Sequence, residues 1–388
     1  MRSVVWDKAL LAYDLGETHP FNPVRLALTI KLATELGVLE DVELLVPGAA
    51  GEDELLRVHA KGYLDAVRDA PGLGADLAHG LGTDDNPVFP DMHEASSLVV
   101  GGTLLAAKQI ASGAAERAVN IAGGLHHAMP DRASGFCVYN DCAIAISWLL
   151  DNGFDRIAYL DTDVHHGDGV QAAFYGDPRV LTISLHQHPR TLWPGTGYAR
   201  ELGAGKGNGY AVNLPLPPGT QDPAWLRAWH AVVPSLLEQF EPQLIVSQCG
   251  VDSHAEDPLA DLSLSVDGHA AIYRNVRELA RRYAGGKWLA IGGGGYQLVR
   301  VVPRSWTHLL ATVLDRDIPG DTAIPEGWRD FVGGLAPRIE LPKAMSDRTD
   351  TDFLAWGGDV SDPTDASILA TRRAVFPLHG LEPDDPRD

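Results

Sequence analysis

The sequence predicts one α/β domain in which a parallel sheet is covered by helices on both faces. Short apolar runs alternate along the chain with longer segments of helical periodicity, which is the pattern of consecutive βαβ units. Reactive polar residues follow directly after several of these runs. The 388 residues contain no internal repeat and no break in composition, so we expect a single domain over residues 1–388.

Seven apolar runs have the length of strands, and six longer patterns have the length of helices. We expect strands at residues 4–6, 42–46, 118–121, 156–160, 180–185, 244–248 and 288–291. We expect helices near residues 25–36, 94–112, 141–152, 223–240, 267–284 and 302–314. Residues 71–90 are rich in Gly, Asp and Pro and predict a long loop, and residues 382–388 predict a disordered tail.

The chain is strongly acidic. Its 52 acidic and 31 basic residues leave a formal charge of −21, which argues against binding to nucleic acid or to anionic membranes because both repel such a surface. A basic partner, such as a lysine-rich protein loop or a polyamine, is compatible with this charge, although acidic surfaces also serve solubility alone.

Cysteine usage and the distribution of apolar residues predict a cytoplasmic protein. Cys137, Cys142 and Cys249 form neither a CxxC motif nor an even set, which favours a reducing compartment. Asp7 and Lys8 interrupt the first apolar stretch, so we expect no signal peptide. No run of about 18 apolar residues predicts a membrane span.

Four clusters of reactive residues stand directly behind expected strands. They are GGLHH at 123–127, DTDVHHGD at 161–168, GVDSH at 250–254 and GGGGY at 292–296. Ligands of open parallel sheets bind beyond the carboxyl ends of the strands. We therefore expect the four clusters to converge on one site.

The segment 161–168 predicts a metal site. Its three carboxylates and two imidazoles would repel one another or stay unsatisfied when buried, unless a cation neutralises them. Asp163 and His165 project to the same side of an extended segment, and Asp252 completes a set of one imidazole and two carboxylates. Such a set leaves a position open for water or a carbonyl and suits Zn²⁺, with Fe²⁺ and Co²⁺ as alternatives.

The other clusters also have simpler explanations. A single histidine is often structural, and His126 and His127 share a site only if they lie on a loop, which the preceding glycines favour. Residues 292–295 lack both the Lys-Ser/Thr ending of a P-loop and an acidic residue at ribose-binding distance, so nucleotide binding is not expected.

At these residues the sequence closely resembles the histone deacetylase family, in particular the bacterial acetoin-utilisation deacetylases, over residues 19–303. The motifs that carry the resemblance, in family order, are HPFNPVR, GGLHHA, SGFCVYND, LDTDVHHGDG, SLHQHPRTLWPGTG, GVDSHAEDPL and GGGGYQL. The resemblance implies the arginase–deacetylase fold, an eight-stranded parallel sheet flanked by helices, with its core over residues 19–320.

The resemblance also implies a catalytic machinery. His127 is expected to act as general base for the attacking water and then as acid for the leaving amine, while His126 stays mostly protonated and stabilises charge. Asp168 and Asp161 are expected to orient His127 and His126 by hydrogen bonds. Tyr296 is expected to donate a hydrogen bond to the tetrahedral oxyanion.

Substrate-binding positions follow from the same resemblance. Phe136 and Trp193, with Gly135 beside them, are expected to form a narrow tube around the lysine methylenes, whereas the simpler reading of both aromatics is core packing. Phe is common in the family where Trp193 stands, so the width of the tube and the acyl preference are open.

The two ends of the tube carry further expectations. Arg25 is expected at the inner end, near an exit path for acetate. Asp84 is expected to hold backbone amides of the substrate at the rim, with Asp85 as the alternative because this loop aligns loosely.

The resemblance implies potassium sites as well. The expected site beside the zinc consists of Asp161, Asp163, His165, Ser184 and Leu185. A second expected site consists of Phe174, Asp177, Val180 and Tyr210.

The function expected from these residues is zinc-dependent removal of acetyl groups from lysine side chains of proteins, and an acetylated acyl-CoA synthetase is the expected partner. The first alternative is an acetylpolyamine amidohydrolase, to which Asp84, Asp85, Asp91 and Glu94 would offer an acidic mouth. An arginase-like enzyme would need more carboxylates around a second metal. An inactive acyl-lysine reader or scaffold is not favoured, because every mechanistic position is present.

Overall fold

The computed structural model describes residues 1–336 and 338–388 and folds them around one eight-stranded sheet. The strands are β1 (Arg2–Val5), β2 (Leu44–Leu45), β3 (Arg117–Asn120), β4 (Ile157–Asp161), β5 (Val180–Gln187), β6 (Ala211–Leu216), β7 (Leu244–Gln248) and β8 (Trp288–Ile291). Their order is β2-β1-β3-β8-β7-β4-β5-β6, and every neighbouring pair is parallel. The parallel α/β sheet predicted from the apolar runs is therefore present.

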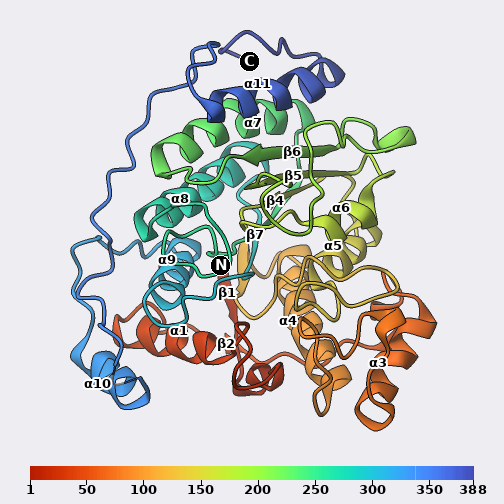
Figure 1. Ribbon diagram of the computed structural model, residues 1–388, viewed down its shortest axis with the longest axis vertical. Helices are drawn as coiled ribbons and strands as arrows, with labels where there is room; N and C mark the ends of the chain where they lie inside the picture. The colour runs from red at the N-terminus through yellow and green to blue at the C-terminus, as the bar shows by residue number, and fades with distance from the viewer. Residues whose placement is uncertain (337) are drawn as a thin grey trace.

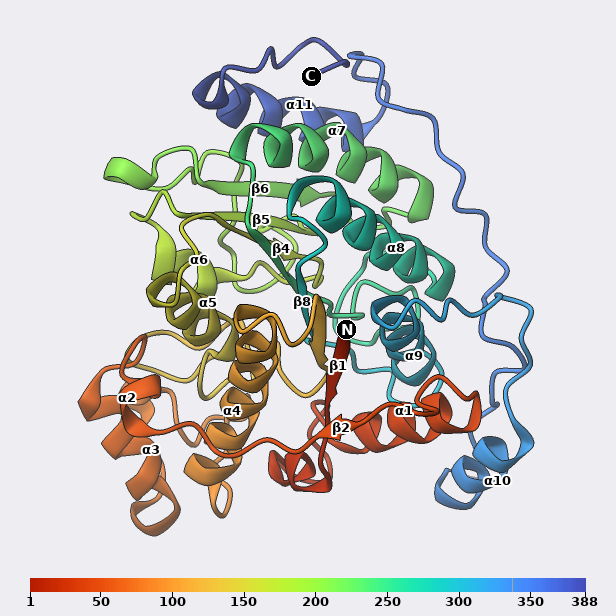
Figure 2. The same cartoon turned by 180° about the vertical axis from the view of Figure 1, so that it is seen from behind.

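Helices cover both faces of this sheet (Figures 1 and 2). They are α1 (Val24–Glu35), α2 (Glu52–Leu55), α3 (Lys61–Leu73), α4 (Met92–Ala111), α5 (Asp141–Asp151), α6 (Asp168–Phe174), α7 (Asp222–Phe240), α8 (Val266–Tyr283), α9 (Val302–Val313), α10 (Glu326–Leu335) and α11 (Pro363–Val375). One face carries α4 and α5, and the other carries α8 and α9. Within the described residues, no helix combines the length and the apolar character needed to cross a membrane.

Burial on both faces explains the composition of the central strands. β4 reads IAYLD and β7 reads LIVSQ, and every residue of both strands is buried. Because helices exclude water from each face, apolar residues occur in continuous runs instead of alternating with polar ones. Asn140, Ser265 and Asp362 begin α5, α8 and α11, each accepting a hydrogen bond from the backbone N–H three residues ahead.

One strand escaped prediction from apolar runs. Asn213 and Pro215 interrupt the run of β6, which for this reason does not read as a buried strand. Pro215 is tolerated because β6 is an edge strand and pairs only with β5. Helices α2, α3, α6, α10 and α11 were also not among the expected elements.

Two expectations about irregular segments need correction. Helix α3 continues to Leu73, and a 3₁₀ turn occupies Leu77–His79, so residues 71–90 are not one continuous loop. Residues 382–388 are not a free tail, since the Arg372 guanidinium donates hydrogen bonds to their backbone. The accepting oxygens belong to Glu382, Pro383, Asp385 and Asp388.

Candidate active site

The clusters behind β4 and β7 meet at the carboxyl end of the sheet. Ligand atoms of Asp163, His165 and Asp252 all lie within 4.8 Å of one another, and all three residues are buried. Nδ1 of His165 is 3.1 Å from Oδ1 of Asp163 and 3.1 Å from Oδ2 of Asp252. The three residues predicted to bind a metal therefore present their donor atoms to a common point.

The remaining carboxylate oxygens of this group are held by the surrounding loops. Oδ2 of Asp163 accepts hydrogen bonds from Nε2 of Gln248 and from the backbone N–H of Gly294, both at 2.8 Å. Oδ1 of Asp252 accepts from the backbone N–H of Val164 at 2.8 Å. The other oxygens, Oδ1 of Asp163 and Oδ2 of Asp252, both face Nδ1 of His165, and Oδ1 of Asp163 also accepts the backbone N–H of His165 at 3.0 Å.

The chemistry of this donor set fits a divalent cation. Burial and the charge of Asp163 raise the pKa of Asp252 to about 8, because two carboxylates share a buried site. A cation between them would remove that repulsion, and one imidazole with two carboxylates is a set that zinc accepts. A Cβ on Gly294 would lie 2.0 Å from Oδ2 of Asp252, so glycine is required for the loop to approach this closely.

Two histidine–aspartate pairs stand beside the metal-ligand group. Nδ1 of His126 is 2.8 Å from Oδ2 of Asp161, and Nδ1 of His127 is 2.7 Å from Oδ1 of Asp168. The two Nε2 atoms are 2.9 Å apart. The predicted loop is confirmed, because His126 and His127 follow the end of β3 and both imidazoles reach the same site.

The two imidazoles have opposite pKa shifts. Burial lowers the pKa of His126, but the charges of Asp161 and Asp163 outweigh it and raise the value to about 9. Burial and the charge of His126 lower the pKa of His127 to about 4, although Asp168 opposes them. The pair thus places a charged imidazole next to a neutral one at pH 7.

A narrow cavity of about 300 Å³ leads to this group. Its lining consists of Asp85, His127, Gly135, Phe136, His165, Leu192, Trp193, Leu259 and Tyr296. A Cβ on Gly135 would lie 2.5 Å from the Trp193 indole and 2.6 Å from the His127 ring, and Gly135 has a φ of +51°. Only glycine therefore leaves this cavity open.

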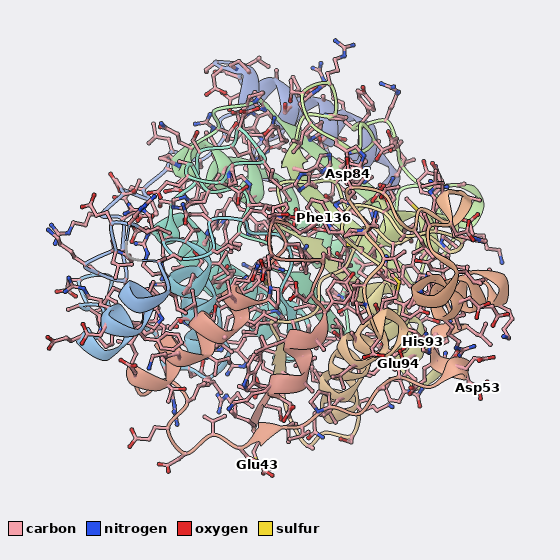
Figure 3. The ribbon with its side chains drawn as sticks, turned by 60° about the horizontal axis from the view of Figure 1, so that its bottom comes forward. Glu43, Asp53, Asp84, His93, Glu94 and Phe136 are labelled. Atoms are coloured by element: carbon pink, nitrogen blue, oxygen red, sulfur yellow. The ribbon has the colours of Figure 1, made fainter. Side chains whose placement is uncertain are left out.

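Both aromatic residues predicted to form the walls line this cavity. Phe136 also packs against the hydrophobic core, and the role of Phe136 and Trp193 as a tube around a lysine chain stays a prediction. At the rim, Asp85, the alternative to Asp84, lines the cavity, and the rim role itself stays a prediction. Figure 3 labels Asp84 and Phe136 in this part of the molecule.

Tyr296 completes the wall of the cavity on the side of β8. Its backbone N–H donates a hydrogen bond of 2.8 Å to Oδ2 of Asp257, and Gly295 before it has a φ of +145°. Burial and the nearby Asp252 raise the pKa of the Tyr296 hydroxyl well above its usual value, so it stays protonated. It is thus available as a hydrogen-bond donor.

Arg25 lies buried beneath the same loop. One of its guanidinium nitrogens donates a 3.0 Å hydrogen bond to the carbonyl oxygen of Gly295. The guanidinium also stacks on the rings of Phe21, at 4.0 Å, and Trp306, at 4.9 Å. Its role near an exit path for acetate stays a prediction.

The expected potassium ligands lie on β4, β5 and their flanking turns. Asp161 and Ser184 are register partners on adjacent strands, and Ser184 Oγ bonds Nδ1 of His186 at 2.8 Å. In the second set, Asp177 pairs with Arg179 and its backbone N–H binds the carbonyl of Phe174. Both potassium sites stay predictions.

Three supporting residues were missed from sequence. The buried Asp141 accepts hydrogen bonds from the backbone N–H groups of Gly124 and Leu125 and thereby fixes the loop that carries the histidines. Gln248 holds Asp163, and Asp257 holds the backbone of Tyr296. Each lies inside a motif or at a strand end already singled out, but polarity alone does not say which backbone group a side chain will bind.

The fold and the site together define a parallel α/β protein with paired histidines, each bonded to an aspartate, beside a group of metal ligands. Residues 19–313 match the model of the histone deacetylase domain. The chain is 44% identical over 351 residues to the acetoin utilization protein AcuC of Bacillus subtilis, covering 89% of this chain and 90% of the relative. It is 40% identical over 328 residues to AcuC of Staphylococcus xylosus, covering 84% and 85%.

Solved structures agree with these matches. The crystal structure of an HDAC homologue from Aquifex aeolicus is 29% identical, with a TM-score of 0.82 over 95% of this chain and 99% of that one. An HDAC homologue complexed with SAHA is 30% identical, with a TM-score of 0.83 over 94% and 99%. The chain belongs to the histone deacetylase family, which confirms the predicted arginase–deacetylase fold and places the chain among the deacetylase hydrolases.

Proposed function

We propose that this chain is a zinc-dependent amidohydrolase that removes acetyl groups from lysine side chains of proteins. The observation that carries the proposal is the inner end of the narrow cavity, which His127 and His165 line together. A substrate reaching this end would meet a general base and a metal ligand at once. This is the arrangement required for hydrolysis of an amide by activated water.

When bound to Asp163, His165 and Asp252, zinc would polarise the acetyl carbonyl and acidify the attacking water. His127 is neutral at pH 7 because its pKa is lowered to about 4, so its Nε2 accepts the proton of the water and later delivers it to the leaving amine. Asp168, bonded to Nδ1, fixes the tautomer in which Nε2 carries no proton.

Two groups stabilise the negative charge that develops on the carbonyl oxygen, His126 through its positive charge and Tyr296 through a hydrogen bond. His126 carries a positive charge, since its pKa is raised to about 9, and its Nε2 is 2.9 Å from Nε2 of His127. Tyr296 keeps its proton and faces the cavity, so its hydroxyl serves as oxyanion donor. Interactions of this kind accelerate a reaction because they strengthen in the transition state.

The lining of the cavity supports a lysine substrate. The rings of Phe136 and Trp193 line the cavity and can pack on a methylene chain, and Asp85 can accept backbone N–H groups of a polypeptide. The names of the AcuC relatives refer to acetoin utilization, and an acetylated acyl-CoA synthetase is the proposed partner. The same proposal includes a potassium ion beside the zinc and a cytoplasmic location. The potassium ligands would be Asp161, Asp163, His165, Ser184 and Leu185, and the three cysteines, which suit a reducing compartment, are buried and free.

The test compares kcat/KM of the zinc-loaded protein on an acetyl-lysine peptide, an intact acetylated protein and acetylspermidine. We expect the peptide and the protein to react faster than the polyamine, because only they offer backbone amides to Asp85. Asp85→Ala should lower the activity on the peptide selectively, and Asp84→Ala serves as its matched neighbour. A wild type that prefers acetylspermidine would establish the acetylpolyamine alternative instead.

The metal is tested separately. Asp252→Ala should abolish stoichiometric zinc binding in elemental analysis while the far-UV circular dichroism stays that of the wild type. Reconstitution of the metal-free wild type with Zn²⁺, Fe²⁺ or Co²⁺ ranks the three ions by kcat. Full zinc occupancy in the Asp252→Ala variant would refute the ligand set.

A further inference from the structure

A segment near the C-terminus, beyond the residues that match the histone deacetylase domain, contacts the loops of the candidate active site. The match to the histone deacetylase domain ends at residue 313, and residues 338–362, which precede α11, run along the outside of the molecule (Figures 1 and 2). Within this stretch, residues 340–349 touch the loops that carry Asp252 and Tyr296. We call residues 340–349 the return segment.

Asp347 is the main anchor of the return segment. Its Oδ2 accepts hydrogen bonds of 2.9 Å from Nε2 of His254 and 2.9 Å from the backbone N–H of Val266, at the start of α8. Its Oδ1 lies 2.7 Å from the guanidinium of Arg304, which is 2% exposed. A carboxylate from outside the matched region therefore neutralises a buried arginine and binds a histidine two residues from the metal ligand Asp252.

His254 connects Asp347 to the loop that carries Asp252. Its Nδ1 accepts the backbone N–H of Glu256 at 3.0 Å, so the ring proton lies on Nε2 and points at Asp347. The imidazole thus closes the turn that follows Asp252 and ties it to the return segment with the same ring. Loss of the bond to Asp347 or of the bond to Glu256 would remove one of the two contacts that fix this turn.

A second anchor reaches the loop of Tyr296. Arg300 donates to the carbonyl oxygen of Glu340 at 2.7 Å, and it forms two bonds with the Glu256 carboxylate at 2.7 and 3.0 Å. Nε of Arg304 donates to the carbonyl oxygen of Arg300 at 2.5 Å. The two anchors are therefore linked through Arg304, and they hold the turn after Asp252 and the turn after Tyr296 in one network.

We infer that the return segment is a positioning element for the metal-ligand loop and the Tyr296 loop, and that Asp347 is its central positioning residue. The inference rests on the proposed metal-dependent function. Asp347 does not touch the metal ligands; it acts through His254 and Arg304 on the backbone that presents Asp252 and Tyr296. Groups hydrogen-bonded directly to metal ligands contribute about 10–100-fold to metal affinity or activity, and Asp347, one contact further away, is expected at the lower end of that range.

The experiment compares two ion-pair hubs in the full-length protein. Asp315 is the matched control, because it binds Arg117 and Arg2, the first residues of β3 and β1. These residues lie at the amino ends of the strands, whereas the candidate active site lies at the carboxyl ends. Both Asp347→Asn and Asp315→Asn should lower the melting temperature of the metal-free protein. Only Asp347→Asn should weaken Zn²⁺ binding in a chelator competition, by about tenfold, and lower kcat with little change in KM.

A milder variant keeps the inference testable if Asp347→Asn does not fold. His254→Phe removes the link to the loop and leaves the Asp347–Arg304 pair in place, so a folded protein with weakened Zn²⁺ binding is expected. Zn²⁺ affinity and kcat within twofold of wild type in a folded Asp347→Asn or His254→Phe protein would overturn the inference and leave Asp347 a purely structural residue. A wild type that binds no Zn²⁺ would instead refute the proposed function.

Discussion

His126 and His127 are adjacent in sequence and each bonds an aspartate through Nδ1, Asp161 and Asp168 respectively, yet the environments of the two pairs differ. Asp161 is fully buried and also accepts from the hydroxyl of Tyr159 at 2.7 Å. Asp168 lines a second cavity of about 560 Å³ on the far side of Trp193. One pair is sealed in the protein, and the other reaches an opening.

The charges around the two imidazoles differ as well. His126 faces the carboxylates of Asp161 and Asp163, whereas His127 faces the imidazoles of His126 and His165. Each ring has one aspartate partner, so the direct partner cannot explain a pKa of about 9 for His126 against about 4 for His127. The second neighbour decides which imidazole is the base and which carries the charge.

Removing the two rings in turn should break this comparison most clearly. His127→Ala should lower kcat by about 10³–10⁴, because it removes the group that takes and returns the proton. His126→Ala should cost less, about 10², since it removes a stabilising charge and leaves the base. Both are measured on zinc-loaded protein at pH 7, with the metal content as control, and a larger loss for His126→Ala would reverse the assigned roles.

Tyr296→Phe asks whether the charge of His126 can replace the oxyanion donor. We expect kcat to fall by about 10²–10³ with KM nearly unchanged, the usual result of losing one donor that acts in the transition state. Steady-state kinetics of the wild type and the variant provide the measurement. An increase in KM at constant kcat would place Tyr296 in substrate binding.

Replacing Asp161 and replacing Asp168 should change different limbs of the pH profile of kcat/KM. Activity requires His127 unprotonated and His126 protonated, so it falls below the lower pKa of the pair and above the higher one. Asp161→Asn removes the charge that raises the pKa of His126 and should shift the alkaline limb to lower pH. Asp168→Asn should instead shift the acid limb to lower pH. Each should also reduce activity by about 10–100-fold. Identical shifts in the two variants would contradict the separate environments.

The smallest expected effect concerns Trp193, the cavity wall that contacts His127 of the His127–Asp168 pair. The Trp193 ring lies 4.6 Å from the ring of His127 and closes the cavity against Gly135. Trp193→Phe should raise the ratio of propionyl-lysine to acetyl-lysine hydrolysis by about tenfold, since one methylene is worth about 10–200-fold in a fitted pocket. The two kcat/KM values measured in one assay give this ratio, and an unchanged ratio would show that Trp193 does not limit acyl length.

Residues that act within one loop could be predicted from the sequence, and contacts between distant segments could not. The spacing of Asp163 and His165 on one extended segment is visible in the chain, as is the glycine-rich approach to His127. Their convergence with Asp252 follows from the fact that parallel strands have their carboxyl ends on the same side of the sheet. These are properties of short segments and of one general rule of sheet topology.

The parts that could not be predicted depend on which backbone group a polar side chain meets. Nothing in the sequence around Asp347 indicates that it binds His254, 93 residues earlier in the chain. Whether Asp84 or Asp85 faces the cavity depends on the path of the loop backbone, because adjacent side chains point in different directions. Strand β6 was hidden because Pro215 contradicts a buried strand and is compatible only with an edge.

The same edge strand has a consequence for the behaviour of the chain in solution. An exposed edge offers unpaired backbone groups to other molecules and promotes aggregation. Here β2 has only two residues at one edge, while at the other edge α11 packs on β6 and Thr371 donates a 2.8 Å hydrogen bond to the carbonyl oxygen of Asn213. The helix lies beyond residue 313, so a shortened chain would keep every candidate catalytic residue and still expose a strand ready to pair with its copies.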